Sequence, residues 1–129
     1  MERVTGIGGI FFKANDPDQL QAWYQRHLGV EPGGEGVVKF EWREALQPEH
    51  KGHTVWAPFP KDTRYFDPST APFMINYRVS NLDRMLEQLR RAGAALEERI
   101  EESEYGRFGW VLDPEGNRIE LWEPPAPKG

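Results

Sequence analysis

Hydrophobic and polar residues follow two kinds of spacing along the chain, one typical of strands and one typical of helices. Residues 7–14 (IGGIFFKA) and 73–80 (FMINYRVS) are rich in β-branched and aromatic residues and are bounded by turn residues, which predicts two strands. After the first strand, an apolar stripe recurs at helical spacing over residues 16–29, at Leu20, Trp23, Tyr24 and Leu28. After the second strand, residues 81–93 repeat it at Leu82, Met85, Leu86 and Leu89. The pattern predicts a strand followed by a helix in each half.

The ends of both helices and the strands that follow them are also indicated. Asp16 is an N-cap candidate with Pro17 after it, and Gln19 completes a capping-box pattern, while Gly29 ends the helix. Asn81 and Gly93 have the same roles in the second half. Three shorter strands are expected there, near 95–101, 107–112 and 117–123. The first half has counterparts near 37–43 and 53–57, with its middle strand poorly marked.

The two halves also resemble each other residue by residue. PEGNRIELWEP (114–124) aligns with PEHKGHTVWAP (48–58), and RFGW (107–110) aligns with KFEW (39–42). MINYRVSNLD (74–83) aligns with the segment that begins at Gly9, at nearly the same offset. Because these matches keep their order over half of the chain, we interpret the protein as two copies of one βαβββ module, 1–65 and 66–129, in one compact domain.

Composition and charge exclude several classes of function. The chain of 129 residues has a net charge of −5 and no basic stretch, so nucleic acid is not an expected partner. No apolar run approaches the ~20 residues that a membrane span needs. Cysteine is absent, which excludes disulfides, thiolate metal sites and a cysteine nucleophile. Without a signal-peptide layout at the N-terminus, we expect a cytoplasmic protein.

The modules and their motifs resemble the vicinal oxygen chelate superfamily, which includes glyoxalase I, bleomycin-resistance proteins and extradiol dioxygenases. The residues that carry the resemblance are FKANDPDQLQAWYQRHLG, NYRVSNLDRMLEQLRRAG and, most specifically, DPEGNRIELWEP. The stretches PFPKDTRYF and YGRFGW are similar to a bacterial subgroup without an assigned reaction. The resemblance implies an α+β fold in which two tandem βαβββ modules form a curved sheet around a cup, with helices on the outer face.

The same resemblance frames a possible metal site. Metal-using members take His, Gln or Glu ligands from the first and last strand of each module, and these positions fall on Gly9, Thr54, Met74 and Glu120. Only Glu120 fits, whereas a catalytic metal normally needs about three protein ligands. His53 is expected on the opposite sheet face from Thr54, although a one-residue shift of the alignment would reverse this. We therefore predict no metal and no cofactor, with a divalent metal as the alternative.

Strand alternation predicts which side chains line the cup. Ile119 and Leu121 are apolar neighbours, so they should pack under a helix and leave Glu120 on the cup side as a buried polar anchor. A buried carboxylate needs a partner, which Asn76, Arg78 or Arg118 could supply from the same side. The candidate ligand-binding residues are Phe11, Trp56, Asn76, Arg78, Arg118 and Trp122. For residues 57–72, which join the modules, a packed crossover is favoured over a lid.

Three classes of function stay open. The first is a glyoxalase- or bleomycin-resistance-like protein that binds a small organic molecule in the cup without a metal. The second is a metal-independent lyase or isomerase in which Glu120 is the general base, so that Glu120 would be catalytic only if the protein is an enzyme. The third is a metal-dependent enzyme, such as a dioxygenase, whose ligands lie elsewhere. A homodimer is expected from the resemblance and from an aromatic content that is difficult to bury completely.

Overall fold

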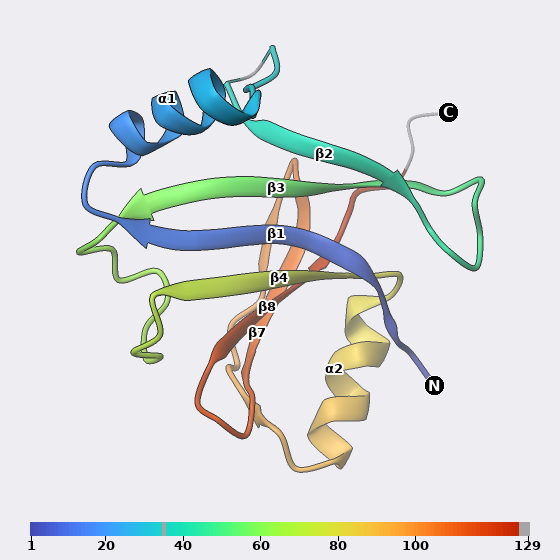
Figure 1. The fold of residues 1–129 in the computed structure, drawn as a ribbon. Coiled ribbons are helices and arrows are strands. Elements are labelled where there is room, and N and C mark those ends of the chain that lie inside the picture. Colours follow the sequence, from blue (N-terminus) through green and yellow to red (C-terminus); the bar gives the residue numbers. More distant parts are fainter. Residues whose placement is uncertain (35, 127–129) are drawn as a thin grey trace.

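The computed structural model describes residues 1–34 and 36–126 (Figure 1). The first half contains β1 (Val4–Ala14), α1 (Pro17–Leu28), β2 (Val38–Arg43) and β3 (Lys51–Pro60). The second half contains β4 (Phe73–Val79), α2 (Leu82–Arg91), β5 (Ala95–Leu96), β6 (Glu101–Ser103), β7 (Gly106–Leu112) and β8 (Arg118–Glu123). Each half therefore begins with a strand and a helix, as the sequence predicts.

All strands belong to one mixed sheet of eight strands, in the order β2-β3-β1-β4-β8-β7-β5, with β6 paired to β7. The halves meet where β1 and β4 pair antiparallel. Within each half the first and last strands pair in parallel, β1 with β3 and β4 with β8. These pairings confirm the predicted α+β fold, while the exact boundary at residues 65 and 66 stays a prediction.

Both helices begin and end where the sequence indicates. The Asp16 side chain accepts a hydrogen bond from the backbone N–H of Gln19 at 3.0 Å, and Gly29 ends α1 with φ of 70°. The Asn81 side chain caps α2 through the N–H of Arg84, and Gly93 follows it with φ of 79°. Among the described residues, no helix is both long and apolar enough to cross a membrane.

Two predicted strands differ from the structure. Between α1 and β2 the described residues form no strand, because this stretch contains Pro32 and several glycines and makes a turn in which the N–H of Gly33 bonds Val37. The strand expected at 95–101 is divided into β5 and β6. Between them, the backbone N–H of Glu97 still donates to the carbonyl of Trp110 at 3.0 Å, and the side chains of Glu97 and Arg99 lie beside Arg118 and Trp110.

The sheet has an outer face, which carries both helices, and an inner face. On the outer face, α2 packs over a helix-side core made of Val79, Leu82, Met85, Leu86, Val111 and Leu121. Ile119 packs against this cluster beside Leu121, as the alternation in β8 predicts. The inner face holds a second cluster, which we call the cup-side core, of Phe66, Met74 and Trp110. Glu120 lies between Ile119 and Leu121 in sequence and therefore points to the inner face.

Candidate functional site

Glu120 is the buried charge at the centre of the inner face. It lies in the middle of β8, opposite Asn76 of β4 and opposite Trp110 of β7. Its exposed fraction is 2%, so the carboxylate lies in the interior and not in solvent, as the sequence predicts. A carboxylate at such a depth requires hydrogen-bond donors around it.

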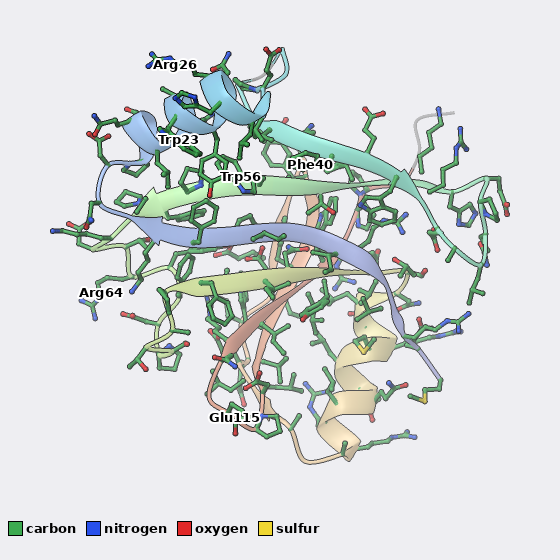
Figure 2. All side chains as sticks on the ribbon, viewed as in Figure 1. Trp23, Arg26, Phe40, Trp56, Arg64 and Glu115 are labelled. Atoms are coloured by element: carbon green, nitrogen blue, oxygen red, sulfur yellow. The ribbon has the colours of Figure 1, made fainter. Side chains whose placement is uncertain are left out.

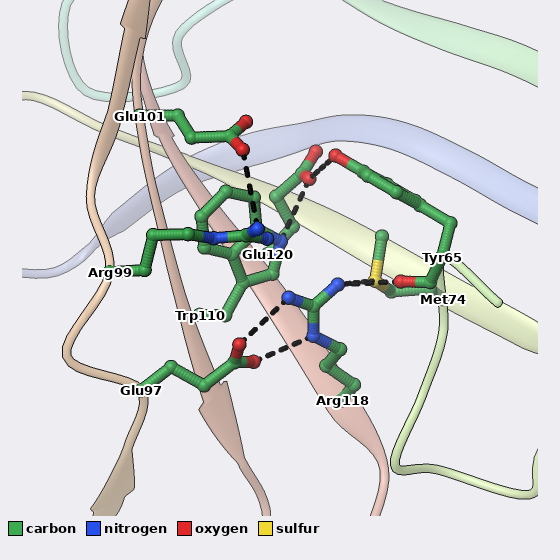
Figure 3. A network of polar contacts seen from close by, with 8 residues as sticks. All are labelled: Tyr65, Met74, Glu97, Arg99, Glu101, Trp110, Arg118 and Glu120. Atoms are coloured by element: carbon green, nitrogen blue, oxygen red, sulfur yellow. Dashed lines mark hydrogen bonds and ion pairs between the residues drawn. The ribbon is translucent and has the colours of Figure 1, made fainter.

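Three donors surround this carboxylate, and Figure 3 shows two of them, Tyr65 and Trp110. The hydroxyl of Tyr65 donates to Oε2 at 2.5 Å, and the indole N–H of Trp110 donates to the same oxygen at 3.0 Å. The side-chain amide of Asn76 donates to Oε1 at 2.7 Å. Both carboxylate oxygens are therefore occupied by groups of the protein itself. Asn76 was one of the predicted partners, whereas Tyr65 and Trp110 were not.

Tyr65 reaches Glu120 from the crossover that joins β3 to β4, residues 61–72. Its ring stacks on Phe59 with centroids 5.8 Å apart, and the neighbouring Phe66 is completely buried in the cup-side core. Burial, followed by the negative charge of Glu120, raises the pKa of the Tyr65 hydroxyl, so this group remains a proton donor. The crossover is thus packed against the inner face, which is the arrangement that the sequence favoured.

Two guanidinium groups lie close to the ring of Trp110 (Figure 3). The central carbons of Arg99 and Arg118 lie 4.7 Å and 4.8 Å from the centroid of its ring. Arg118 is also held by Glu97, through bonds of 2.7 Å from Nε and 2.9 Å from Nη2. The predicted site residue Arg118 therefore lies on the inner face but supports Trp110, and it does not contact Glu120 directly.

Asn76 has one buried polar atom without a partner. Its Nδ2 donates to Glu120, but its Oδ1 accepts no hydrogen bond from the described residues, although the side chain is 97% buried. Asn76 Oδ1 can lie in this position because residue 8 is glycine. A Cβ at residue 8 would collide with Oδ1 and would lie 2.8 Å from the Trp122 ring. Gly8 is therefore necessary for the present position of the Asn76 amide.

At the other end of the inner face, Arg78 and Trp122 border a pocket of about 710 Å³. We call it the tail pocket, because the residues after β8 form one side and the turn between β2 and β3 forms another. His53 also lines it and contacts Trp122, with ring centroids 5.4 Å apart. Burial, followed by the charge of Lys39, lowers the pKa of His53, so the imidazole is neutral at neutral pH.

Trp56 is not part of the inner face, and its predicted place in the cup wall is wrong. It pairs with Ile10 and packs against Phe12 and against Tyr24 of α1, with centroids 5.1 Å and 4.8 Å away. Trp56 therefore lies beneath the first helix (Figure 2). The cause is a one-residue shift in the alignment of the copies, since His53 and not Thr54 points inward. The remaining predicted residue, Phe11, packs against the cup-side core.

The residues at the superfamily's metal positions do not fit a metal centre. Gly9 has no side chain, Thr54 donates to the carbonyl of Ile7, and Met74 is buried in the cup-side core. His53, which points inward in place of Thr54, contacts Trp122 and lines the tail pocket. The three side chains that contact the Glu120 carboxylate do so as N–H and O–H donors, which a metal would have to displace. Across residues 1–34 and 36–126, no group of three or more His, Asp or Glu side chains could hold an ion.

Comparison with known proteins identifies the class. A profile of the glyoxalase-like domain family matches residues 9–122, and the chain therefore belongs to this family. The resemblance to the vicinal oxygen chelate superfamily is thereby confirmed. No curated protein sequence matches this chain.

Solved structures agree on the fold. Methylmalonyl-CoA epimerase from Mycobacterium tuberculosis is 24% identical over 97% of this chain and 91% of that one, with a TM-score of 0.60. A variant of methylmalonyl-CoA epimerase from Streptomyces coelicolor, in complex with 2-nitronate-propionyl-CoA, is 16% identical over 96% of this chain and 100% of that one, with a TM-score of 0.70. A structure described as NAD-dependent benzaldehyde dehydrogenase from Legionella pneumophila is 11% identical over 91% of this chain and 98% of that one, with a TM-score of 0.59. At these identities the likeness shows the fold alone.

Sequence reasoning missed Tyr65, Trp110 and His53 as site residues. For Trp110 a signal existed, because it lies within a predicted strand that is joined by a short turn to the strand holding Glu120 and pairs with it. For Tyr65 the signal was weaker: the crossover is too apolar for a solvated linker, but nothing in it specifies which residue faces Glu120. For His53 only the register of β3 decides the direction of the side chain.

Proposed function

We propose that this protein binds a small organic molecule in the tail pocket and does so without a catalytic metal. The observation that carries the proposal is the convergence of Trp122, His53 and Arg78 on one pocket of about 710 Å³. This volume is within the range of about 300–1,000 Å³ for sites of small ligands, and such sites combine aromatic surfaces with a few polar groups. The proposal gives no role to nucleic acid or to a membrane.

The state of Glu120 supports binding over proton transfer. A general base must reach the proton of a substrate, but the hydroxyl of Tyr65 and the indole of Trp110 already occupy Oε2. Asn76 occupies Oε1. The carboxylate thus has the surroundings of a structural anchor that organises the inner face, and the ligand is assigned to the open end of that face.

A ligand screen tests the proposal. Small organic compounds would be screened by ligand-observed NMR, and hits would be titrated against the wild type, Trp122→Phe and the matched control Trp23→Phe, which alters an exposed ring on α1. We expect Trp122→Phe to weaken binding about tenfold while Trp23→Phe has no effect. Equal effects of the two substitutions would contradict the assignment to the tail pocket.

Metal independence is tested separately by elemental analysis of untagged protein. We expect zinc, nickel, manganese and iron well below one atom per chain, and ligand binding that is unchanged by a chelator. About one metal per chain, lost on Glu120→Gln, would contradict this part of the proposal. The chemistry of the site supports the expectation, since Tyr65, Trp110 and Asn76 contact Glu120 as hydrogen-bond donors and no group of three or more His, Asp or Glu side chains among the described residues could hold an ion.

A second candidate function is proton transfer by Glu120 in a metal-independent isomerase or lyase. The observation that favours it is a second cavity of about 690 Å³ that is lined by Tyr65 and Arg118, because the Tyr65 hydroxyl that contacts Oε2 belongs to a residue of this cavity. In this case a substrate would replace the Tyr65 hydroxyl on Glu120. Loss of turnover in Glu120→Gln, with ligand binding retained, would establish this function over simple binding.

We also propose that the chain is a homodimer. The outer face carries β1 and β4 side chains that neither helix covers, and Ile7, Ile10 and Phe73 each retain about 40% of their exposure. Figure 1 shows these two strands crossing the front of the molecule between α1 and α2. A contiguous apolar patch between two helices is typical of a protein interface.

A further inference from the structure

The tail pocket contains several charged side chains, but those that reach its interior are already paired. Arg78 Nη1 lies 3.1 Å from Glu44 Oε2 and donates to the hydroxyl of Thr5 at 2.8 Å. The same oxygen of Glu44 lies 3.0 Å from Nδ1 of His50. Oε1 of Glu123 accepts the backbone N–H of Leu82 at 2.7 Å. Among the described residues that line the pocket, no cation in the interior is therefore available to an anionic ligand without loss of an existing bond.

Breaking these bonds would be unfavourable, because Arg78 and Glu44 are both largely buried. A carboxylate that recruited Arg78 would leave Glu44 as a buried charge without its strongest partner. At the rim, Glu49 and Lys51 are exposed, and they contribute one negative and one positive charge. Among the described residues that line the pocket, the carboxylates Glu44, Glu49 and Glu123 outnumber the cations Lys51 and Arg78, so this lining gives an anion no net advantage. Lys39, whose charge acts on His53 from β2, is not one of these lining residues.

His53 has the opposite character. Its imidazole lines the pocket and makes no side-chain hydrogen bond to any other residue in the described part of the chain. A neutral imidazole offers one N–H donor and one nitrogen acceptor. Beside it, the Trp122 indole is fixed by a 2.7 Å bond from Nε1 to the carbonyl of Tyr105 and by its stacking with Phe108. Trp122 therefore contributes a rigid aromatic surface, while His53 contributes the free hydrogen-bonding groups.

We infer that the tail pocket selects an uncharged planar ligand with a donor–acceptor edge, and that His53 is the residue that determines this specificity. The inference rests on the proposed function, because it describes the ligand of the same pocket. An aromatic carboxamide or a comparable neutral heteroaromatic ring fits this chemistry: its ring contacts the part of Trp122 that lines the pocket, and its amide edge pairs with His53. The corresponding carboxylate lacks the donor and carries a charge that the pocket does not neutralise.

Matched pairs of probes test this inference: nicotinamide against nicotinate, benzamide against benzoate, and indole-3-carboxamide against indole-3-carboxylate. Binding would be measured by NMR titration, with the Trp122 indole N–H and the His53 ring as reporters. We expect each carboxamide to bind about tenfold more tightly than its carboxylate, the ratio that one net hydrogen bond supplies. His53→Phe should abolish this ratio, and His53→Gln, which keeps a donor and an acceptor, should preserve it.

The outcomes separate the inference from the proposed function. Carboxylates that bind as tightly as the carboxamides would overturn the inference and leave the proposed function standing. The carboxamide-to-carboxylate affinity ratio could instead disappear in Glu49→Gln and survive in His53→Phe. That result would assign the selectivity to the charge at the rim and would also overturn the inference. If no probe perturbs Trp122 or His53 at millimolar concentration, the proposed function fails at this pocket and the inference fails with it. Glu115→Gln, in a distant exposed turn, is the control for surface charge.

Discussion

The hydroxyl of Tyr65 donates to Oε2 of Glu120 at 2.5 Å, although the two residues are 55 positions apart in the chain. This bond ties the crossover between the halves to the last strand of the sheet. It also closes the inner face over Glu120, because Phe66 follows Tyr65 into the cup-side core. Five predictions follow from this arrangement, from the spaces around it and from the unpaired outer face.

Tyr65→Phe should lower the free energy of unfolding by about 1.5–3 kcal/mol, since it removes a hydrogen bond to a charged group. The bond should also give a pH signature. The folded-state pKa of Tyr65 is raised above its ordinary value of 10.0, so its stabilisation is complete below pH 10 and is lost as the pH rises further. Urea unfolding of the wild type and the variant would measure both effects.

Tyr24→Phe is the matched control, because Tyr24 packs its ring against Trp56 and has no hydroxyl partner among the described residues. Its effect should remain within about 0.5 kcal/mol. A Tyr65→Phe variant as stable as this control would mean that the hydroxyl bond contributes nothing to the fold.

Glu120→Ala should destabilise the protein by about 3 kcal/mol or more, because it leaves the indole N–H of Trp110 and the amide of Asn76 without their acceptor in a buried site. Glu120→Gln should cost less, about 1–2 kcal/mol, since one oxygen remains as an acceptor. Chemical unfolding of both variants beside Glu115→Ala, which changes an exposed residue, gives the comparison. An unchanged melting temperature in Glu120→Ala would contradict the role of a buried anchor.

Gly8→Ala should destabilise the protein by about 1–3 kcal/mol, the usual cost of inserting a methyl group into a filled space. The added Cβ would collide with Asn76 Oδ1 and the Trp122 ring, so the bond from Asn76 to Glu120 should weaken as well. Gly34→Ala is the matched control, because a Cβ at residue 34 meets no atom within 4 Å. Equal stability of the two variants, measured by urea unfolding, would contradict the close packing at Gly8.

Acid should destabilise the wild type more than His53→Gln. The folded-state pKa of His53 lies below its ordinary value of 6.5, because burial and the charges of Lys39 and Arg78 lower it. The charge of Glu41 raises this pKa but does not outweigh them. Below about pH 6.5 the unfolded chain therefore binds a proton that the folded protein does not. As the pH falls through this range, the free energy of unfolding decreases, until the pH drops below the folded-state pKa. Urea midpoints at several pH values between about 7.5 and 5 would measure this slope. Identical slopes in the two proteins would exclude a neutral, partly buried His53.

The outer face predicts the assembly. Light scattering at micromolar concentration should give the mass of a dimer, and Ile10→Glu, which places a charge in the exposed apolar patch on β1, should give a monomer. Glu115→Lys, a charge change in the exposed turn before β8, should remain a dimer. A monomeric wild type would contradict the proposed homodimer, whereas a dimeric Ile10→Glu variant would place the interface elsewhere.

The sequence by itself determined the local structure and part of the site. Asp16 and Asn81 mark the starts of the helices because their side chains satisfy backbone N–H groups within the same turn. The burial of Glu120 could be predicted from Ile119 and Leu121, since neighbours along a strand must point to opposite faces. These predictions succeeded because each depends on interactions between residues close together in the chain.

Only the tertiary structure decided which groups meet at Glu120 and which face β3 presents. Tyr65 approaches the carboxylate from the crossover, and no local pattern encodes that meeting. Trp110 approaches from the neighbouring strand, where the sequence indicates the pairing but does not fix its register. The register of β3 places His53 inward and Trp56 under α1, because a shift of one residue moves every side chain of a strand to the opposite face. Strand pairing over long sequence separations fixes that register, so the site became visible only in the assembled sheet.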